Sequence, residues 1–193
     1  VDPARLEAEQ FAAHGLAWYS TYLEGLRQLL DWTARLAASG RLGEVETLIL
    51  QAGFGEYLAQ MRGGLAISQG EIVRPADMGI DAAALAAFAT PAVDTLIRQG
   101  NDNATRMRLA RLIEHGGFGD SGLDDEALTM IRDQFHRFVE QQILPAAHDW
   151  HRRDVLIPMA IVDAMSAMGV FGLTIPEAHG GLGVDMLSYA VAM

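Results

Sequence analysis

Residues 123–193 read LDDEALTMIRDQFHRFVEQQILPAAHDWHRRDVLIPMAIVDAMSAMGVFGLTIPEAHGGLGVDMLSYAVAM, and this stretch decides the fold. Its apolar residues recur at steps of three and four, which is the spacing of one face of an α-helix. The first such stripe consists of Leu128, Ile131, Phe135, Phe138 and Val139. Pro145 should kink or end that helix, because proline lacks the amide hydrogen that a helix interior needs.

The start of this helix and the rest of the stretch are set by helix-capping residues. We expect Asp124 to cap the first helix, with Asp125 and Glu126 favoured near its positive N-terminus. Pro158 should open the next helix and Gly169 should close it. After them we expect an extended segment, a loop and a last helix, over Val170–Ile175, Pro176–Gly183 and from Asp185 to the end of the chain.

The N-terminal half predicts a helical hairpin. Asp2 can cap a first helix, which Ser39-Gly40 ends. Its predicted buried stripe consists of Leu16, Tyr19, Leu23, Leu26 and Leu30. A second helix, from about Gly43 to Met61, is apolar on two sides and should be buried, and Gly53 and Gly55 would let a neighbour approach closely.

The hairpin is followed by less regular sequence. Residues 63–79 show no clear period and predict a long loop. Short helices should cover 81–88, 91–99 and 104–115, with caps at Thr90 and around Asp102. We therefore predict an all-α chain with three parts: a helical extension over 1–116, a Gly-rich linker over 117–123 and an incomplete helical domain over 124–193.

Composition excludes several classes of protein. The net charge of −11 argues against a nucleic-acid surface, which needs a basic face. The absence of cysteine excludes disulfides and thiolate chemistry. No apolar run approaches the ~20 residues of a membrane span, and no signal peptide is recognisable, so we expect a cytoplasmic protein that binds no membrane. The chain begins without Met and ends in an apolar segment, which suggests a piece of a longer polypeptide.

Two motifs resemble binding sites. Gly180-Gly181-x-Gly183 invites a phosphate-binding interpretation, but a dinucleotide fingerprint needs a βαβ unit, so a tight loop is the better interpretation. His148 and His151, near Asp149 and Asp154, have a spacing that superficially suits a metal, yet no further ligands are evident. We therefore assign no metal-ligating residue.

Other polar residues have structural interpretations. Glu56 on the apolar second helix could act as a base, although pairing with Arg62 or Arg74 is more usual for such a group. Four loop residues could bind a ligand or simply stabilise their loop: Ser68, Gln69, Glu71 and Arg74. The isolated histidines have no catalytic partners in the sequence: His14, His115, His136 and His179.

The order of elements after residue 123 resembles the N-terminal helical domain of the acyl-CoA dehydrogenase family. The matching segments are Phe135–Glu140 leading to Pro145, then Pro158, then Gly169–Glu177, and Gly180-Gly181-Leu182-Gly183. His179 departs from the aromatic residue common at its position. Residues 1–123 are not part of an ordinary member, and they resemble the extension of one branch of the family, which acts on a branched dicarboxyl-CoA thioester.

The resemblance implies FAD as cofactor, an acyl-CoA thioester as substrate, electron-transfer flavoprotein as acceptor and a homo-oligomeric protein. In this family a Glu removes the proton α to the thioester carbonyl, and flavin accepts the β hydride. Nothing in the 193 residues matches that Glu or the flavin-contacting segment. We therefore assign no catalytic or cofactor-binding residue, expect FAD to be held mainly beyond Met193, and expect this stretch alone to be inactive.

Two alternatives remain open from the sequence. The chain could belong to another acyl-CoA dehydrogenase whose extension serves assembly or tail recognition. It could also be a non-enzymatic helical interaction module. If the chain is part of an acyl-CoA dehydrogenase of either kind, we expect the apolar residues near the chain end to pack against structure beyond Met193. These residues are Leu173, Ile175, Leu187, Tyr189 and Val191.

Overall fold

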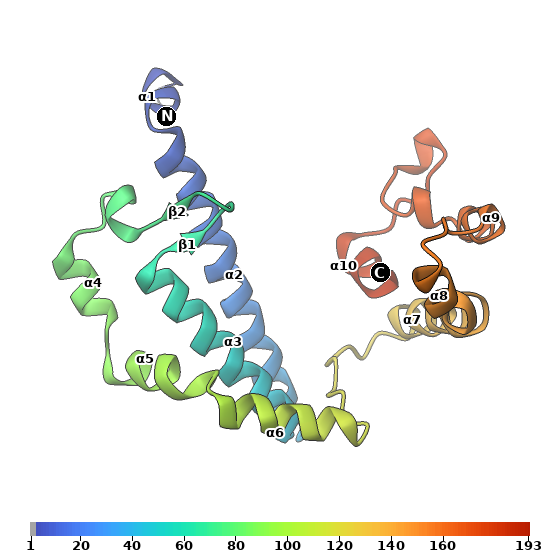
Figure 1. Cartoon of the computed structure of the whole chain (residues 1–193), viewed down its shortest axis with the longest axis horizontal. Helices are drawn as coiled ribbons and strands as arrows, with labels where there is room; N and C mark the ends of the chain where they lie inside the picture. Colours follow the sequence, from blue (N-terminus) through green and yellow to red (C-terminus); the bar gives the residue numbers. More distant parts are fainter. Residues whose placement is uncertain (1–2) are drawn as a thin grey trace. The chain divides into compact units, whose positions relative to one another are not determined.

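The computed structural model describes residues 3–193, with side chains from Leu6 onward. The chain forms two compact units, one ending at Gly122 and the other running from Leu123 to Met193 (Figure 1). Within these residues the only sheet has two strands and the remaining regular structure is helical, which confirms the all-α class. No helix in this described part is long and apolar enough to cross a membrane.

The first unit is built on a pair of long helices that lie side by side (Figure 1). Its elements are α1 (Pro3–Ala8), α2 (Gln10–Ala38), α3 (Glu44–Gly63), β1 (Leu65–Ala66), β2 (Ile72–Val73), the 3-10 helix η1 (Pro75–Met78), α4 (Ala82–Phe88), α5 (Pro91–Thr95), the π turn η2 (Leu96–Gly100) and α6 (Asn103–Glu114). The helical hairpin is confirmed, and Gly40 ends α2 with a φ of 71°. The cap predicted at Asp2 lies outside the described residues.

The short helices of this unit begin at side-chain caps, of which Thr90 and Asp102 were predicted and Asp81 was not. Asp81 accepts a hydrogen bond from the amide of Ala84, and Thr90 accepts one from Val93. Asp102 does the same for Thr105 at the start of α6. Each side chain satisfies an amide that the first helical turn would leave unpaired.

The buried face of α2 differs from the predicted stripe. Tyr19 and Leu26 are buried, but Leu16, Leu23 and Leu30 are each more than half exposed. The buried residues of this helix are Gly15, Tyr19, Leu26, Thr33 and Leu36. The spacing of apolar residues does not identify this buried face, because two of its members, Gly15 and Thr33, are not apolar side chains. A Cβ on Gly15 would overlap the side chain of Val73, which occupies the space that the glycine leaves.

The predicted loop over 63–79 contains a small β-hairpin, so that prediction is wrong in part. β1 and β2 pair antiparallel with Leu65 opposite Val73. Both side chains are fully buried and pack with Tyr19. The strands have two residues each, too few to show an alternating pattern in the sequence.

The second helix, α3, is packed on several sides, as predicted. Between Val45 and Arg62 only Gln51 is largely exposed. Gly55 touches the backbone of η2, since a Cβ there would lie 2.7 Å from the carbonyl oxygen of Leu96. From the other side, a Cβ on Gly100 would overlap the carbonyl oxygen of Gln51. The two glycines thus allow backbone to pack against backbone.

The second unit is a set of helices joined by tight turns. Its elements are α7 (Glu126–Phe138), the π turn η3 (Val139–Ile143), α8 (Leu144–Arg152), α9 (Met159–Ala167), the 3-10 helices η4 (Val170–Gly172) and η5 (Glu177–His179), and α10 (Met186–Ala192). Pro145 lies in the first turn of α8, after the wide turn η3, so the helical path continues past it. Within this unit α10 packs against α7.

Several details of this unit were predicted correctly. Pro158 immediately precedes α9. Gly169, with a left-handed φ of 79°, follows the end of this helix. Asp185 caps α10 by accepting a hydrogen bond from the amide of Ser188 at 2.7 Å. Leu128 is buried, as its stripe predicted.

Other details need correction. The cap of α7 is Asp125, whose carboxylate accepts from the amides of Ala127 and Leu128, and not Asp124. Val139 is exposed, although its stripe predicted burial. Residues 170–175 are not extended, because η4 and a turn occupy them.

The close contact at Gly55 gives a first prediction. Gly55→Ala should lower the free energy of unfolding by about 2 kcal/mol, since its methyl group would collide with backbone that cannot turn aside. Gly25→Ala, in the middle of α2 with no atom within 4 Å of the new Cβ, is the matched control. It should raise the stability by up to about 1 kcal/mol through helix propensity. Equal thermal melts for the two variants would contradict the proposed packing.

Candidate functional site

The Gly-rich motif at 180–183 is a tight loop whose amides are already used. The amide of Leu182 donates to the carbonyl of Gly172 at 2.9 Å, and the amide of Gly183 donates to Ile175 at 2.9 Å. A Cβ on Gly181 would overlap the carbonyl oxygen of Ile175. The glycines therefore allow two backbone segments to approach, as a tight loop requires, and leave no row of amides for a phosphate.

This loop also tests whether the described residues fit a flavin dinucleotide. A pyrophosphate is usually held by free amides at a glycine-rich turn and the following helix N-terminus. Here the amides of residues 180–183 donate to backbone carbonyl groups between residues 172 and 177. The loop at 180–183 does not fit that role, and we assign none of its residues to FAD.

The second unit instead carries apolar hollows. One of about 630 Å³ lies between α8 and α9. It is lined by Ile143, Ala147, Trp150, His151, Val155, Ile157, Ile161, Val162, Met165 and Phe171. Beside it Leu156 is 93% exposed. Such surface favours contact with an apolar ligand group or with further polypeptide.

A neighbouring hollow of about 530 Å³ lies against α10 and shares Met165 and Phe171 with the first. Of the residues expected to pack beyond the chain end, Ile175 and Leu187 are exposed, while Tyr189 and Val191 are half-buried. Leu173 is buried within its own unit, so that part of the expectation is wrong.

The histidines of α8 do not gather metal ligands. Asp149 pairs with Arg153 at 3.1 Å, and His151 lines the larger hollow. Asp154 has a left-handed φ of 52° in the turn that ends the helix. Among residues 3–193, no group of three or more His, Cys, Asp or Glu side chains is placed to hold a metal ion.

The isolated histidines take local roles. His14 accepts a hydrogen bond from the indole of Trp18 at 3.0 Å. His115 lies 2.7 Å from the carbonyl oxygen of Arg111. His136 is 3.6 Å from Glu140 on an exposed helix face, and His179 ends the short helix η5.

Glu56 is held as a carboxylate, although its partners were predicted wrongly. It accepts hydrogen bonds from the side-chain amides of Gln60 at 2.6 Å and Asn101 at 2.9 Å. These bonds lower the pKa of Glu56 below its usual value. Arg62 pairs with Asp94 instead. A carboxylate whose pKa is lowered is a weak base, so the arrangement supports a structural role.

The polar residues of the β-hairpin stabilise their own turn. Ser68 donates to the carboxylate of Glu71 at 3.0 Å across the tip. The backbone amide of Arg74 donates to Asp77 at 2.7 Å, and its guanidinium donates to the carbonyl of Ile72. This agrees with the structural interpretation of these residues.

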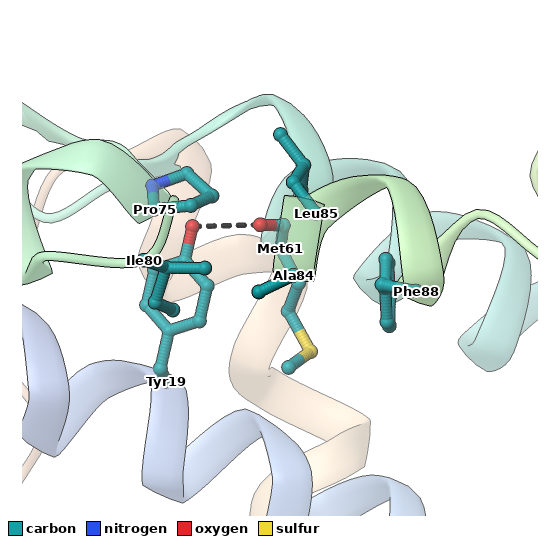
Figure 2. Close-up of a pocket in the computed structure, with 7 residues that line it drawn as sticks. All are labelled: Tyr19, Met61, Pro75, Ile80, Ala84, Leu85 and Phe88. Atoms are coloured by element: carbon teal, nitrogen blue, oxygen red, sulfur yellow. Dashed lines mark hydrogen bonds between the residues drawn. The ribbon is translucent and has the colours of Figure 1, made fainter. Parts of the chain in front are cut away.

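Sequence reasoning missed a small apolar cavity in the first unit. It has a volume of about 130 Å³ and is lined by Tyr19, Met61, Pro75, Ile80, Ala84, Leu85 and Phe88 (Figure 2). The hydroxyl of Tyr19 donates to the carbonyl of Met61 at 2.7 Å, and burial, more than the charge of Asp77, raises the pKa of Tyr19. The lining side chains can surround a small aliphatic group, but they offer no unpaired polar atom to orient a ligand.

Comparison with known proteins relates part of this sequence to a family. Residues 125–193 match the family described as acyl-CoA dehydrogenase, N-terminal domain. The chain is 53% identical to (2S)-methylsuccinyl-CoA dehydrogenase of Cereibacter sphaeroides over 195 residues, which is 99% of this chain and 35% of that protein. Residues 125–193 thus belong to the acyl-CoA dehydrogenase family, and the resemblance inferred from the sequence is confirmed.

Two other relatives align over shorter stretches. Human mitochondrial short-chain specific acyl-CoA dehydrogenase is 34% identical over 68 residues, 35% of this chain and 16% of that protein. The caffeyl-CoA reductase-Etf complex subunit CarC of Acetobacterium woodii is 34% identical over 64 residues, 33% of this chain and 17% of that protein. The chain spans about a third of the (2S)-methylsuccinyl-CoA dehydrogenase that it matches.

The lowered pKa of Glu56 predicts a pH dependence of stability. Because the folded pKa lies below the unfolded value near 4.5, the unfolded chain binds more protons in this range. The contribution of Glu56 is therefore present above that value and lost as the pH falls through the folded pKa. Glu56→Gln should be less stable than wild type at pH 7, and the two melting temperatures should converge as the pH falls from 4.5 through the folded pKa of Glu56. Glu114→Gln, on the exposed end of α6, should show no such convergence.

Proposed function

We propose that this chain is the N-terminal part of an FAD-dependent dehydrogenase that oxidises (2S)-methylsuccinyl-CoA to mesaconyl-CoA. The observation that carries the proposal is the 53% identity to (2S)-methylsuccinyl-CoA dehydrogenase over 99% of the chain. That alignment includes the first unit, which lies outside the matched family domain. A substrate assignment based on the family domain alone would be much weaker, because one fold serves many substrates.

The shorter alignments support the same choice. The short-chain specific relative aligns over 68 residues and leaves most of the chain unmatched. Residues 124–193 would then be the start of the dehydrogenase N-terminal domain, residues 1–116 its extension and residues 117–123 the linker. In the full protein a Glu would remove the α proton of the thioester, and FAD would supply the acceptor for the β hydride.

The remaining assignments follow from the same proposal. We expect a cytoplasmic homo-oligomer that acts in the ethylmalonyl-CoA pathway and passes electrons to electron-transfer flavoprotein. One relative is a subunit of a caffeyl-CoA reductase-Etf complex, which supports that kind of acceptor. The net charge of −11 favours neither nucleic acid nor an anionic membrane surface as a partner.

The proposal predicts the activity of the full-length protein. Purified protein should show a flavin absorption spectrum and should oxidise (2S)-methylsuccinyl-CoA with a kcat/KM at least about 100-fold above that for butyryl-CoA, an effect of roughly 2.7 kcal/mol in the transition state. The measurement is reduction of an artificial electron acceptor with a panel of CoA thioesters.

Two outcomes would contradict this proposal in different ways. Faster oxidation of another thioester would indicate a dehydrogenase of different specificity with a similar extension. Full-length protein that carries no flavin and oxidises no thioester would indicate a helical interaction module.

A further inference from the structure

Asp120 holds the Gly-rich segment 116–122 on the first unit through both its backbone and its side chain. Its backbone amide donates to the carboxylate of Glu46 at 2.7 Å, and its carbonyl accepts from the indole of Trp32 at 3.0 Å. Its own carboxylate accepts from the amide of Gly122 at 2.8 Å and pairs with Arg41 at 3.3 Å. Both the backbone and the side chain of Asp120 are therefore held.

Glu46 is the buried part of this arrangement. It is 5% exposed, and a buried carboxylate is costly unless its oxygens are satisfied. One oxygen accepts from the amide of Gly43 at 2.9 Å, at the start of α3, and the other accepts from Asp120. The connecting segment thus supplies a donor that helps this carboxylate to lie inside the unit.

The partners of Asp120 are far from it in the sequence and close to one another at one end of the hairpin. Trp32 lies near the end of α2, Arg41 lies in the turn between the helices, and Glu46 lies in the first turn of α3. Trp32 donates to the carbonyl of Asp120, Arg41 pairs with its carboxylate, and Glu46 accepts from its amide. The closed end of the helical hairpin is therefore the docking surface of this segment.

The glycines of the segment fit this docked path. Gly119 has a φ of 81°, and a Cβ there would lie 3.2 Å from the carboxylate of Glu46. Gly122 has a φ of 68°, and a Cβ there would lie 3.1 Å from the ring of Trp32. Both positions need the left-handed backbone and close approach that glycine allows. Their presence is explained by docking and does not require a mobile linker.

We propose that Asp120, Glu46, Trp32 and Arg41 form a latch that holds residues 117–122 on the closed end of the α2–α3 hairpin. With the latch closed, the connecting segment belongs to the structure of the first unit, and the chain leaves that unit from a fixed point at Gly122. With the latch open, the same residues become a free tether. The proposal does not depend on the substrate of the full protein.

Limited proteolysis of the full-length protein tests the latch. Phe118 is 77% exposed, so its side chain is available to chymotrypsin, but cleavage needs the backbone around it to leave the docked path. Wild-type protein should be cleaved slowly after Phe118. Glu46→Ala should speed that cleavage about ten- to a hundredfold, as expected for a lost hydrogen bond to a charged group.

The matched control is Glu44→Ala, in the same turn of α3. Glu44 is exposed, pairs with Arg108 at 2.6 Å and makes no hydrogen bond to the segment among the described residues. Its removal should leave cleavage after Phe118 unchanged. Cleavage after Tyr57, within α3, reports global unfolding and should stay slow in every variant that keeps α3 folded.

Trp32→Phe keeps the proposal testable if Glu46→Ala unfolds α3. It removes the indole donor to Asp120 while it keeps an aromatic ring at this position, and it should speed cleavage after Phe118 about fivefold. Hydrogen exchange of the Asp120 amide should be slow in wild type and faster in both variants. Rapid wild-type cleavage at Phe118, or a rate in Trp32→Phe equal to wild type, would overturn the latch.

Discussion

The first unit depends on the close packing of α3 against η2, where Gly55 and Gly100 bring two backbones into contact. The same helix packs against α2, where Gly53 leaves room for the side chain of Leu29. Its N-terminal end binds α6 through the ion pair of Glu44 with Arg108 and the connecting segment through Glu46. Because α3 touches so many neighbours, changes that move it should disturb the whole unit, while changes on the exposed face of α2 should have small effects.

The second unit is organised differently. Its last turns are held by backbone hydrogen bonds between residues 172–175 and 182–184, while Leu128 and Leu173 are the buried apolar residues of the unit. Much of its apolar surface lines open hollows. A small domain with so little buried apolar area gains little stability from its own core. The unit matches the N-terminal domain of a dehydrogenase family and covers only part of a much longer relative. Its open apolar surface suits such a part.

The sequence predicts what local interactions determine and misses what distant contacts determine. Helix ends at Gly40, Thr90 and Asp185 follow from capping chemistry within a few residues. The buried face of α2 depends on Val73, and the distant partner of Glu56 is Asn101, so neither could be inferred from spacing. The docking of Asp120 joins residues 74 positions apart and was equally hidden. For the candidate site, the motif at 180–183 was interpreted correctly as a loop, whereas the apolar cavity and hollows gave no sequence signal.

The central claim is that α3 is the element on which the first unit depends. Native-state hydrogen exchange of the full-length protein, resolved to single amides, tests it most directly, because protection reports the free energy needed to expose each amide. Our account predicts that the slowest exchange in the first unit falls in the middle of α3, near Gly55 and Leu58, with faster exchange in α4 and α6. Exchange in α3 as fast as in α6 would show that this helix opens by itself and would contradict the account.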